Sequence, residues 1–133
     1  MATVERLEDL KVWQKARDLS RKVYPYTFKD PIKSDFRFKD QIRGTAGSIM
    51  DNIAEGFGRG GTKEFINSLG YAKGETDEIK SHLYRGLDNE YFTKEEFEAL
   101  YSLADEITKM LTRLMEYLNN CDIRGPKFKN RSK

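Results

Sequence analysis

The sequence predicts an all-α protein that folds as an antiparallel up-down four-helix bundle. Four segments repeat their apolar residues with a period near 3.6, short connections join them, and no segment alternates apolar with polar residues as a strand would. The chain has 133 residues, the size of one domain with one continuous core. We therefore expect a bundle over residues 1–120 and a basic, flexible tail over residues 121–133.

The first two helices are expected over residues 7–24 and 36–57. Pro25 lacks the N–H that a helix interior needs, so the first helix should end or kink near residues 24–28. The predicted core positions are Val12, Ala16, Leu19, Val23, Phe38, Ile42, Thr45, Ala46, Ile49, Ile53 and Phe57. A run of small residues indicates close backbone approach of a neighbouring helix: Gly44, Ala46, Gly47 and Ser48. The motif GFGRGG at residues 56–61 then stops the second helix.

The third helix is expected to open with Thr62 as its N-cap, and the fourth to open after a capping box made by Thr93 and Glu96. In a capping box each of the two side chains binds the other residue's backbone N–H. The predicted core positions are Phe65, Ile66, Leu69, Ala72, Thr76, Ile79, Leu83, Leu87, Phe97, Leu100, Ala104, Ile107, Leu111, Leu114 and Leu118. In the fourth helix these positions step strictly by three and four residues, as in a heptad seam.

Charge is unevenly distributed along the chain. Residues 1–61 carry 12 basic and 9 acidic side chains, residues 62–120 carry 7 and 12, and residues 121–133 carry 5 and 1. Such asymmetry suits either contact with phosphate or attraction between subunits. The lone Cys121 excludes an internal disulfide, and the opening MATVERLEDL has charges where a signal peptide has its apolar core. No apolar stretch is long enough to cross a membrane, so we expect a cytoplasmic protein with no membrane partner.

No residue pattern supports catalysis or a cofactor. A di-iron bundle needs two Glu-x-x-His pairs, and the chain has a single histidine, His82. Because His82 follows Glu78 by four residues, we expect a helix-face ion pair or contact with solvent. Cys121 has no neighbouring His or Lys in the sequence to activate its thiol, so a passive thiol is expected. We predict no catalytic residue, no metal ligand and no cofactor, and therefore a protein that is not an enzyme.

The GFGRGG motif allows two interpretations. Glycines before a helix can hold a phosphate, yet this motif follows no strand and lacks the Gly-Lys-Ser/Thr ending of a phosphate-binding loop. A connecting turn is favoured, and Arg59 and Lys63 keep an anion-contacting loop open as the alternative. For Asn52 and Glu55 beside the motif, a network with neighbouring backbone groups is favoured over a polar site.

Two sets of basic residues are candidates for contact with nucleic acid. The tail combines cations with Phe128, an aromatic that could stack on a base; its cations are Lys127, Lys129, Arg131 and Lys133. A solubilising tail is the alternative. The first two helices carry a further basic face, which is either solvated or convergent on phosphate: Lys11, Lys15, Arg17, Arg21, Lys22, Arg37, Lys39 and Arg43.

Aromatic and aliphatic side chains flank the core stripes beyond what one bundle needs, and they predict a homo-oligomer. They are Leu10, Trp13, Tyr71, Tyr84, Tyr101 and Tyr117.

Four motifs resemble a known family: LKVWQKA near the start, QIRGTAGSI and DNIAEGFGRG in the second helix, and TKEF opening the third. The family is the bacterial four-helix-bundle family named for proteins encoded in intervening sequences of 23S rRNA genes, and the accessory variability determinants of diversity-generating retroelements share its fold. The resemblance implies a homopentameric ring and basic surfaces that bind nucleic acid or nucleoprotein. The chain departs from the family pattern at Met50, where proline is common, and at Gly44, where a basic contact beside Arg43 is missing.

Two function hypotheses follow. The first is a non-enzymatic oligomer that binds RNA or DNA through Arg43, Arg59, Lys63 and the tail, with little sequence specificity. The alternative is a scaffold that binds another protein, with no direct nucleic-acid role.

Overall fold

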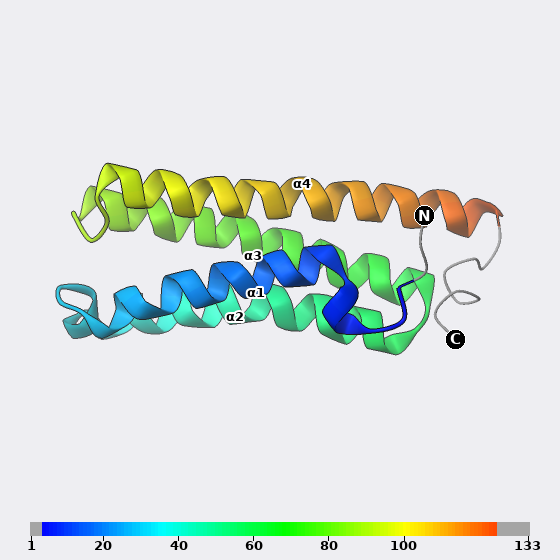
Figure 1. Cartoon of the computed structure of the whole chain (residues 1–133), viewed down its shortest axis with the longest axis horizontal. Helices are drawn as coiled ribbons and strands as arrows, with labels where there is room; N and C mark the ends of the chain where they lie inside the picture. Colours follow the sequence, from blue (N-terminus) through cyan, green and yellow to red (C-terminus); the bar gives the residue numbers. More distant parts are fainter. Residues whose placement is uncertain (1–3, 125–133) are drawn as a thin grey trace.

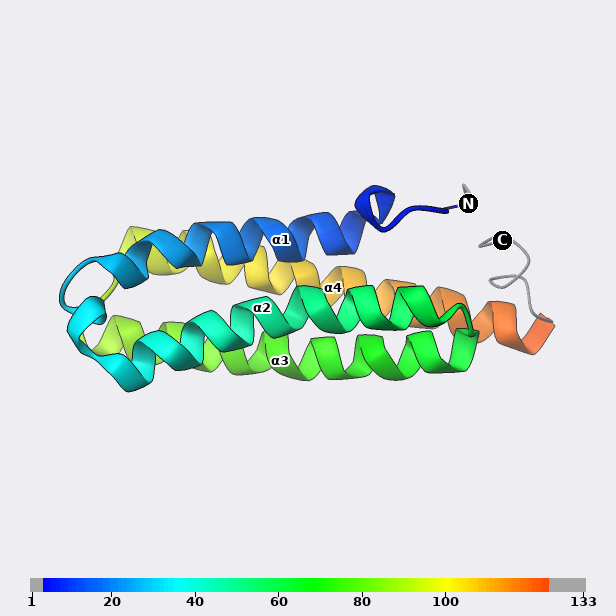
Figure 2. The same cartoon turned by 90° about the horizontal axis from the view of Figure 1, so that it is seen from below.

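The computed structural model describes residues 4–124, with side chains as far as Cys121. Its long helices are α1 (Lys11–Val23), α2 (Phe36–Arg59), α3 (Thr62–Asp88) and α4 (Lys94–Arg124). Consecutive helices run antiparallel (Figure 1). α2 packs against α1 and α3, and α4 packs against α3 and α1 (Figure 2). The part of the chain that is described contains no strand, so the predicted all-α four-helix bundle is confirmed.

The core lies along the bundle axis and follows the predicted period. All but four of the predicted core positions are buried; Phe57, Ile66, Leu87 and Leu114 are partly buried and pack against the core. Leu10, expected on a flanking stripe, is itself a core residue with 6% exposure. The structure therefore corrects the flanking set at this position, because the chain turns inward just before α1 begins.

The first α-helix is shorter than the periodicity predicts. Residues 7–9 form a separate 3-10 turn, η1 (Leu7–Asp9), and α1 begins only at Lys11 because Leu10 has an extended backbone. After α1 the chain tightens into η2 (Tyr24–Phe28), which contains Pro25, and into η3 (Ile32–Ser34). The predicted end near residues 24–28 is confirmed.

At the turn from α2 to α3, the GFGRGG motif is helical through Arg59. The helix ends at Gly60, whose φ of 78° lies in the left-handed region that glycine adopts without a steric cost. The predicted cap at Thr62 is wrong. Gly61 has the extended cap conformation and its carbonyl accepts from the N–H of Phe65 at 3.0 Å, whereas Thr62 is the first helical residue and is buried.

Close backbone approach occurs at a different glycine from those predicted. A Cβ built at Gly44 or Gly47 meets nothing within 4 Å, so the expectation for these two residues is wrong. At Gly56 an added Cβ would lie 2.8 Å from Ser68 Oγ and nearer still to its Cβ. The two helices therefore approach most closely near the α2–α3 turn, where their side chains have the least room.

The capping box at α4 is confirmed. The N–H of Thr93 donates to Glu96 Oε1 at 2.8 Å, and the N–H of Glu96 donates to Thr93 Oγ1 at 3.1 Å. α4 continues to Arg124 and buries Cys121, so the helix extends past the expected bundle boundary at residue 120. Residues 125–133, with the predicted tail contacts, lie outside the described residues.

Candidate nucleic-acid interface

Aromatic and basic side chains lie together where α1 is joined to α2. We call this set the aromatic–basic cluster: Tyr24, Phe28, Phe36, Lys39 and Arg43. η2 supplies the first two, and the first two turns of α2 supply the others. The connection lies at the end of the bundle that also holds the α3–α4 turn (Figure 1).

Arg43 is held in place at the centre of the cluster. Its Nε–H donates to Thr27 Oγ1 at 2.7 Å, and the buried Thr27 hydroxyl donates in turn to the carbonyl of Tyr24 at 2.6 Å. Its guanidinium carbon lies 4.5 Å from the ring centre of Tyr24 and 4.7 Å from that of Phe28. These are cation–π distances, so the arginine is fixed by one hydrogen bond and two rings.

The terminal amino groups of Arg43 remain available. Within the described side chains and backbone, no group accepts a hydrogen bond from them, and no carboxylate pairs with the guanidinium. A guanidinium with free N–H groups matches the oxygens of a phosphate or carboxylate. Arg43 is therefore positioned to bind an anion without rearranging.

The segment of the chain that contains this arginine is rich in positive charge. Residues 11–43 carry ten basic and four acidic side chains, a net charge of +6. Three of the four carboxylates already have partners: Asp18 pairs with Lys22 at 3.1 Å, Asp30 accepts a hydrogen bond from the hydroxyl of Ser34, and Asp35 caps α2. Lys39 has no ion pair among the described residues, and its Nζ lies 4.8 Å from the ring centre of Phe36. The α1–α2 side thus carries the main excess of positive charge in the described chain.

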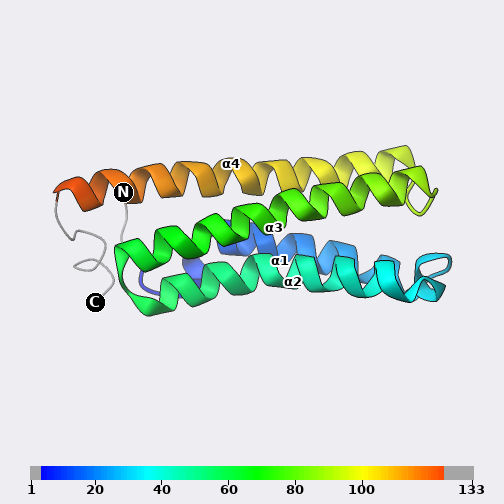
Figure 3. The same ribbon diagram turned by 180° about the vertical axis from the view of Figure 1, so that it is seen from behind.

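The structure separates the site residues that the sequence grouped together. Arg43 lies near the start of α2 and Arg59 at its end, sixteen residues later, which is about 24 Å along a helix. α2 runs from the α1–α2 connection to the α2–α3 turn (Figure 3). Lys63, in the first turn of α3, lies with Arg59 at the far end. The two groups cannot contact one phosphate.

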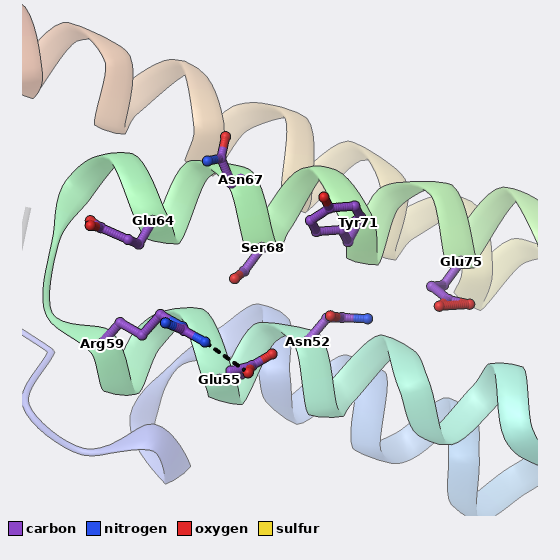
Figure 4. A pocket seen from close by; sticks show the side chains of 8 residues that line it. All are labelled: Asn52, Glu55, Arg59, Glu64, Asn67, Ser68, Tyr71 and Glu75. Atoms are coloured by element: carbon purple, nitrogen blue, oxygen red, sulfur yellow. Dashed lines mark hydrogen bonds and ion pairs between the residues drawn. The ribbon is translucent and has the colours of Figure 1, made fainter.

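A groove of about 500 Å³ lies between α2 and α3 beside Arg59 (Figure 4). It is lined by Asn52, Glu55, Arg59, Glu64, Asn67, Ser68, Tyr71 and Glu75. The lining holds three carboxylates and one guanidinium, and that guanidinium is paired with Glu55 at 3.1 Å. Burial raises the pKa of the Glu75 carboxyl, and the carboxylate of Glu78 adds to the rise. This groove presents negative charge, which does not favour phosphate.

The interpretation of a network with neighbouring backbone groups is confirmed for Asn52, whereas the partner of Glu55 is a side chain. Asn52 Nδ2 donates to the carbonyl of Ser48 at 3.0 Å within its own helix, and Glu55 pairs with Arg59 one turn later. That Arg59 and Lys63 contact nucleic acid remains a prediction. The acidic groove beside Arg59 supports such a contact less than the surroundings of Arg43 do.

His82 is buried, with 5% exposure, where the sequence allowed contact with solvent. The predicted partner is correct, because Nε2 lies 3.4 Å from Glu78 Oε2, and α2 adds the hydroxyl of Thr45 at 3.2 Å. Nδ1 lies 3.3 Å from Arg85 Nη1, which can only donate. Nδ1 is therefore the acceptor and Nε2 carries the proton. Burial lowers the pKa of His82; Arg85 lowers it further and Glu78 opposes the change.

The described residues offer neither a metal site nor a membrane-spanning helix. No three His, Cys, Asp or Glu side chains in the part of the chain that is described gather closely enough to hold a metal ion. None of the helices there is long and apolar enough to cross a bilayer.

Sequence reasoning missed the three rings of the cluster. The sequence pattern places Tyr24 at the end of the first helix, Phe28 in the connection and Phe36 at the start of the second helix. The spacing of Tyr24 and Phe28, four residues apart in a basic region, is the signal that could have indicated them.

Residues 8–113 match the family described as 23S rRNA-intervening sequence protein. A crystal structure at 1.70 Å of a protein of unknown function from the S23 ribosomal protein family of Bacteroides thetaiotaomicron VPI-5482 is similar in fold, with a TM-score of 0.73. It is 29% identical, and the alignment covers 80% of this chain and 96% of that one. No curated protein matches the chain.

Proposed function

The chain belongs to the family of 23S rRNA-intervening sequence proteins, and from that premise we propose that it binds nucleic acid through its α1–α2 side without catalysing a reaction. The observation that carries the proposal is the environment of Arg43, whose side chain is fixed by Thr27 and two rings while no group among residues 4–124 accepts a hydrogen bond from its terminal amino groups. A pre-ordered cation loses little conformational freedom when it meets a phosphate.

The surrounding charge supports the same proposal. A net charge of +6 over residues 11–43 attracts a polyanion, and contacts to phosphate position a strand without reading its sequence. The +4 charge of residues 121–133 adds to this attraction in our proposal.

A salt titration tests the proposal. Binding of a labelled oligonucleotide is measured by fluorescence anisotropy for the wild type, for Arg43→Gln and for the matched variant Arg59→Gln. We expect Arg43→Gln to weaken binding and to lower the slope of log K against log salt by about one, because one phosphate contact is lost. Arg59→Gln should have a smaller effect on both quantities, since Arg59 is paired with Glu55 in a groove whose lining holds two further glutamates.

Two results would count against the proposal. If the wild type binds no oligonucleotide at low salt, or binds one with no salt dependence, the nucleic-acid hypothesis fails and the protein scaffold is favoured. If Arg43→Gln and Arg59→Gln weaken binding equally, the aromatic–basic cluster is not the interface.

We further propose that the chain forms a homo-oligomer, for which the family resemblance implies five subunits. Tyr71 supports a protein contact on α3, because 70% of this side chain is exposed. Light scattering should give a mass several times that of one chain, and Tyr71→Ser should reduce it. A monomer at micromolar concentration would contradict this proposal.

A further inference from the structure

The exposed rings of the aromatic–basic cluster carry an inference that rests on the proposed function and goes beyond it. Three of the five large exposed hydrophobic side chains in the described chain belong to this cluster: Tyr24 is 47% exposed, Phe28 57% and Phe36 69%. Phe28 and Phe36 are only eight residues apart, and both keep much of their apolar surface in water. A partner that covered these rings would therefore gain the free energy of burying that surface.

Each cation of the cluster lies against one or two of its rings. Tyr24 and Phe28 meet edge to face with ring centres 5.1 Å apart, and Arg43 lies against both. The ammonium group of Lys39 lies over the ring of Phe36. A partner that covers this surface must therefore bring both flat apolar groups and negative charge.

A single nucleic-acid strand has this chemistry. Its bases offer flat faces that stack on aromatic side chains, and its phosphates lie between successive bases. In a duplex the bases are already stacked on each other, so their faces are not available to the rings of the cluster. A protein surface that used charge alone would have no need of exposed phenylalanines.

We propose that the aromatic–basic cluster binds unpaired nucleotides of single-stranded nucleic acid, with bases stacked on Phe28 and Phe36 and phosphates at Arg43 and Lys39. The protein therefore prefers a single strand to a duplex of the same sequence. Because no contact to the sugar is involved, the stacking interaction is open to RNA and DNA alike.

The test compares a labelled strand of about 12 nucleotides with its duplex and with an abasic strand that keeps the phosphates. Each is used in RNA and in DNA form, with the full chain at one salt concentration. We expect the wild type to bind the single strand more tightly than the duplex and the abasic strand, in at least one of the two forms.

The variant Phe28→Leu/Phe36→Leu removes the flat rings and keeps apolar side chains. It should weaken single-strand binding by about tenfold or more and leave duplex binding unchanged, so that the preference disappears. The matched control is Tyr84→Leu, an exposed aromatic on α3, which should keep the preference. Circular dichroism establishes that each variant is folded. If the double variant does not fold, the single variant Phe36→Leu takes its place.

The outcomes separate this inference from the proposed function. Equal binding of the single strand, the duplex and the abasic strand by the wild type overturns the inference and leaves nucleic-acid binding in place. A preference that survives in Phe28→Leu/Phe36→Leu, or that is lost equally in Tyr84→Leu, overturns it too. Failure of every probe to bind overturns both.

Discussion

The hydroxyl group of Tyr91 donates a hydrogen bond of 2.5 Å to the carboxylate of Asp35. The second oxygen of that carboxylate accepts from the N–H of Phe38 at 3.1 Å and so caps α2. Tyr91 lies in the turn between α3 and α4, and one side chain therefore joins the start of α2 to that turn. Both hydrogen bonds hold the pKa of Asp35 below its ordinary value of 3.8, and the bond from Tyr91 has the larger effect.

Tyr91→Phe should destabilise the protein at neutral pH and flatten its acid dependence. The lowered pKa of Asp35 means that its stabilisation is complete above the unfolded value of 3.8 and is lost as pH falls through the folded value. Urea midpoints measured between about pH 5 and pH 2 should fall more steeply for the wild type than for Tyr91→Phe. Tyr101→Phe is the control, since the Tyr101 hydroxyl makes no hydrogen bond within the described residues. Parallel curves for wild type and Tyr91→Phe would contradict the assignment.

His82 should make the protein less stable as the solution becomes weakly acidic. Burial lowers its pKa in the folded state, so between that value and 6.5 the unfolded chain binds the additional proton and stability rises with pH. Because His82 is the only histidine, His82→Gln should remove the dependence in this window. Urea midpoints at several pH values below 7.5 compare the two proteins. The same slope in both would show that His82 does not titrate as described.

Gly56→Ala and Gly44→Ala should have opposite effects on stability. A methyl group at Gly56 would meet Ser68 and lie 3.1 Å from Phe65 Cδ1, so it should cost about 1–3 kcal/mol of unfolding free energy. At Gly44 the methyl group meets nothing within 4 Å, and the higher helix propensity of alanine should stabilise the protein by up to about 1 kcal/mol. Thermal and urea unfolding measure both. If Gly56→Ala is neutral, the close approach of α2 and α3 is wrong.

Deletion of residues 125–133 should weaken nucleic-acid binding and leave helicity and oligomer size unchanged. We place the deletion after Arg124 because α4 extends to that residue. The deletion removes Lys127, Lys129, Arg131 and Lys133, so the salt slope should fall by up to about 3. The full-length chain with these four residues changed to glutamine is the matched control and should behave like the deletion. Unchanged affinity at every salt concentration would make the tail a solubilising segment.

Most of the helical framework can be predicted from local residue patterns. The heptad seam from Phe97 to Leu118 determines which face of α4 is buried, because residues three and four apart share one side of a helix. The capping box of Thr93 and Glu96 needs only a four-residue segment, so it is visible in the sequence and present in the structure. The turn at GFGRGG is equally local, although the cap falls on Gly61 and not on Thr62.

The candidate site depends on contacts between segments that are distant in the sequence. Arg43 is separated from Thr27 by sixteen residues, and its value as an anion site appears only when η2 folds back against α2 and places two rings beside it. His82 meets Thr45 across α2 and α3, which buries a histidine that its own helix would leave exposed. Periodicity fixes the buried side of each helix, whereas the choice of partners across helices depends on the relative position of their axes. For this reason the bundle, its charge asymmetry and the spacing of Arg43 and Arg59 along α2 follow from the sequence, while the contacts around Arg43 and the acidic groove beside Arg59 arise only from tertiary packing.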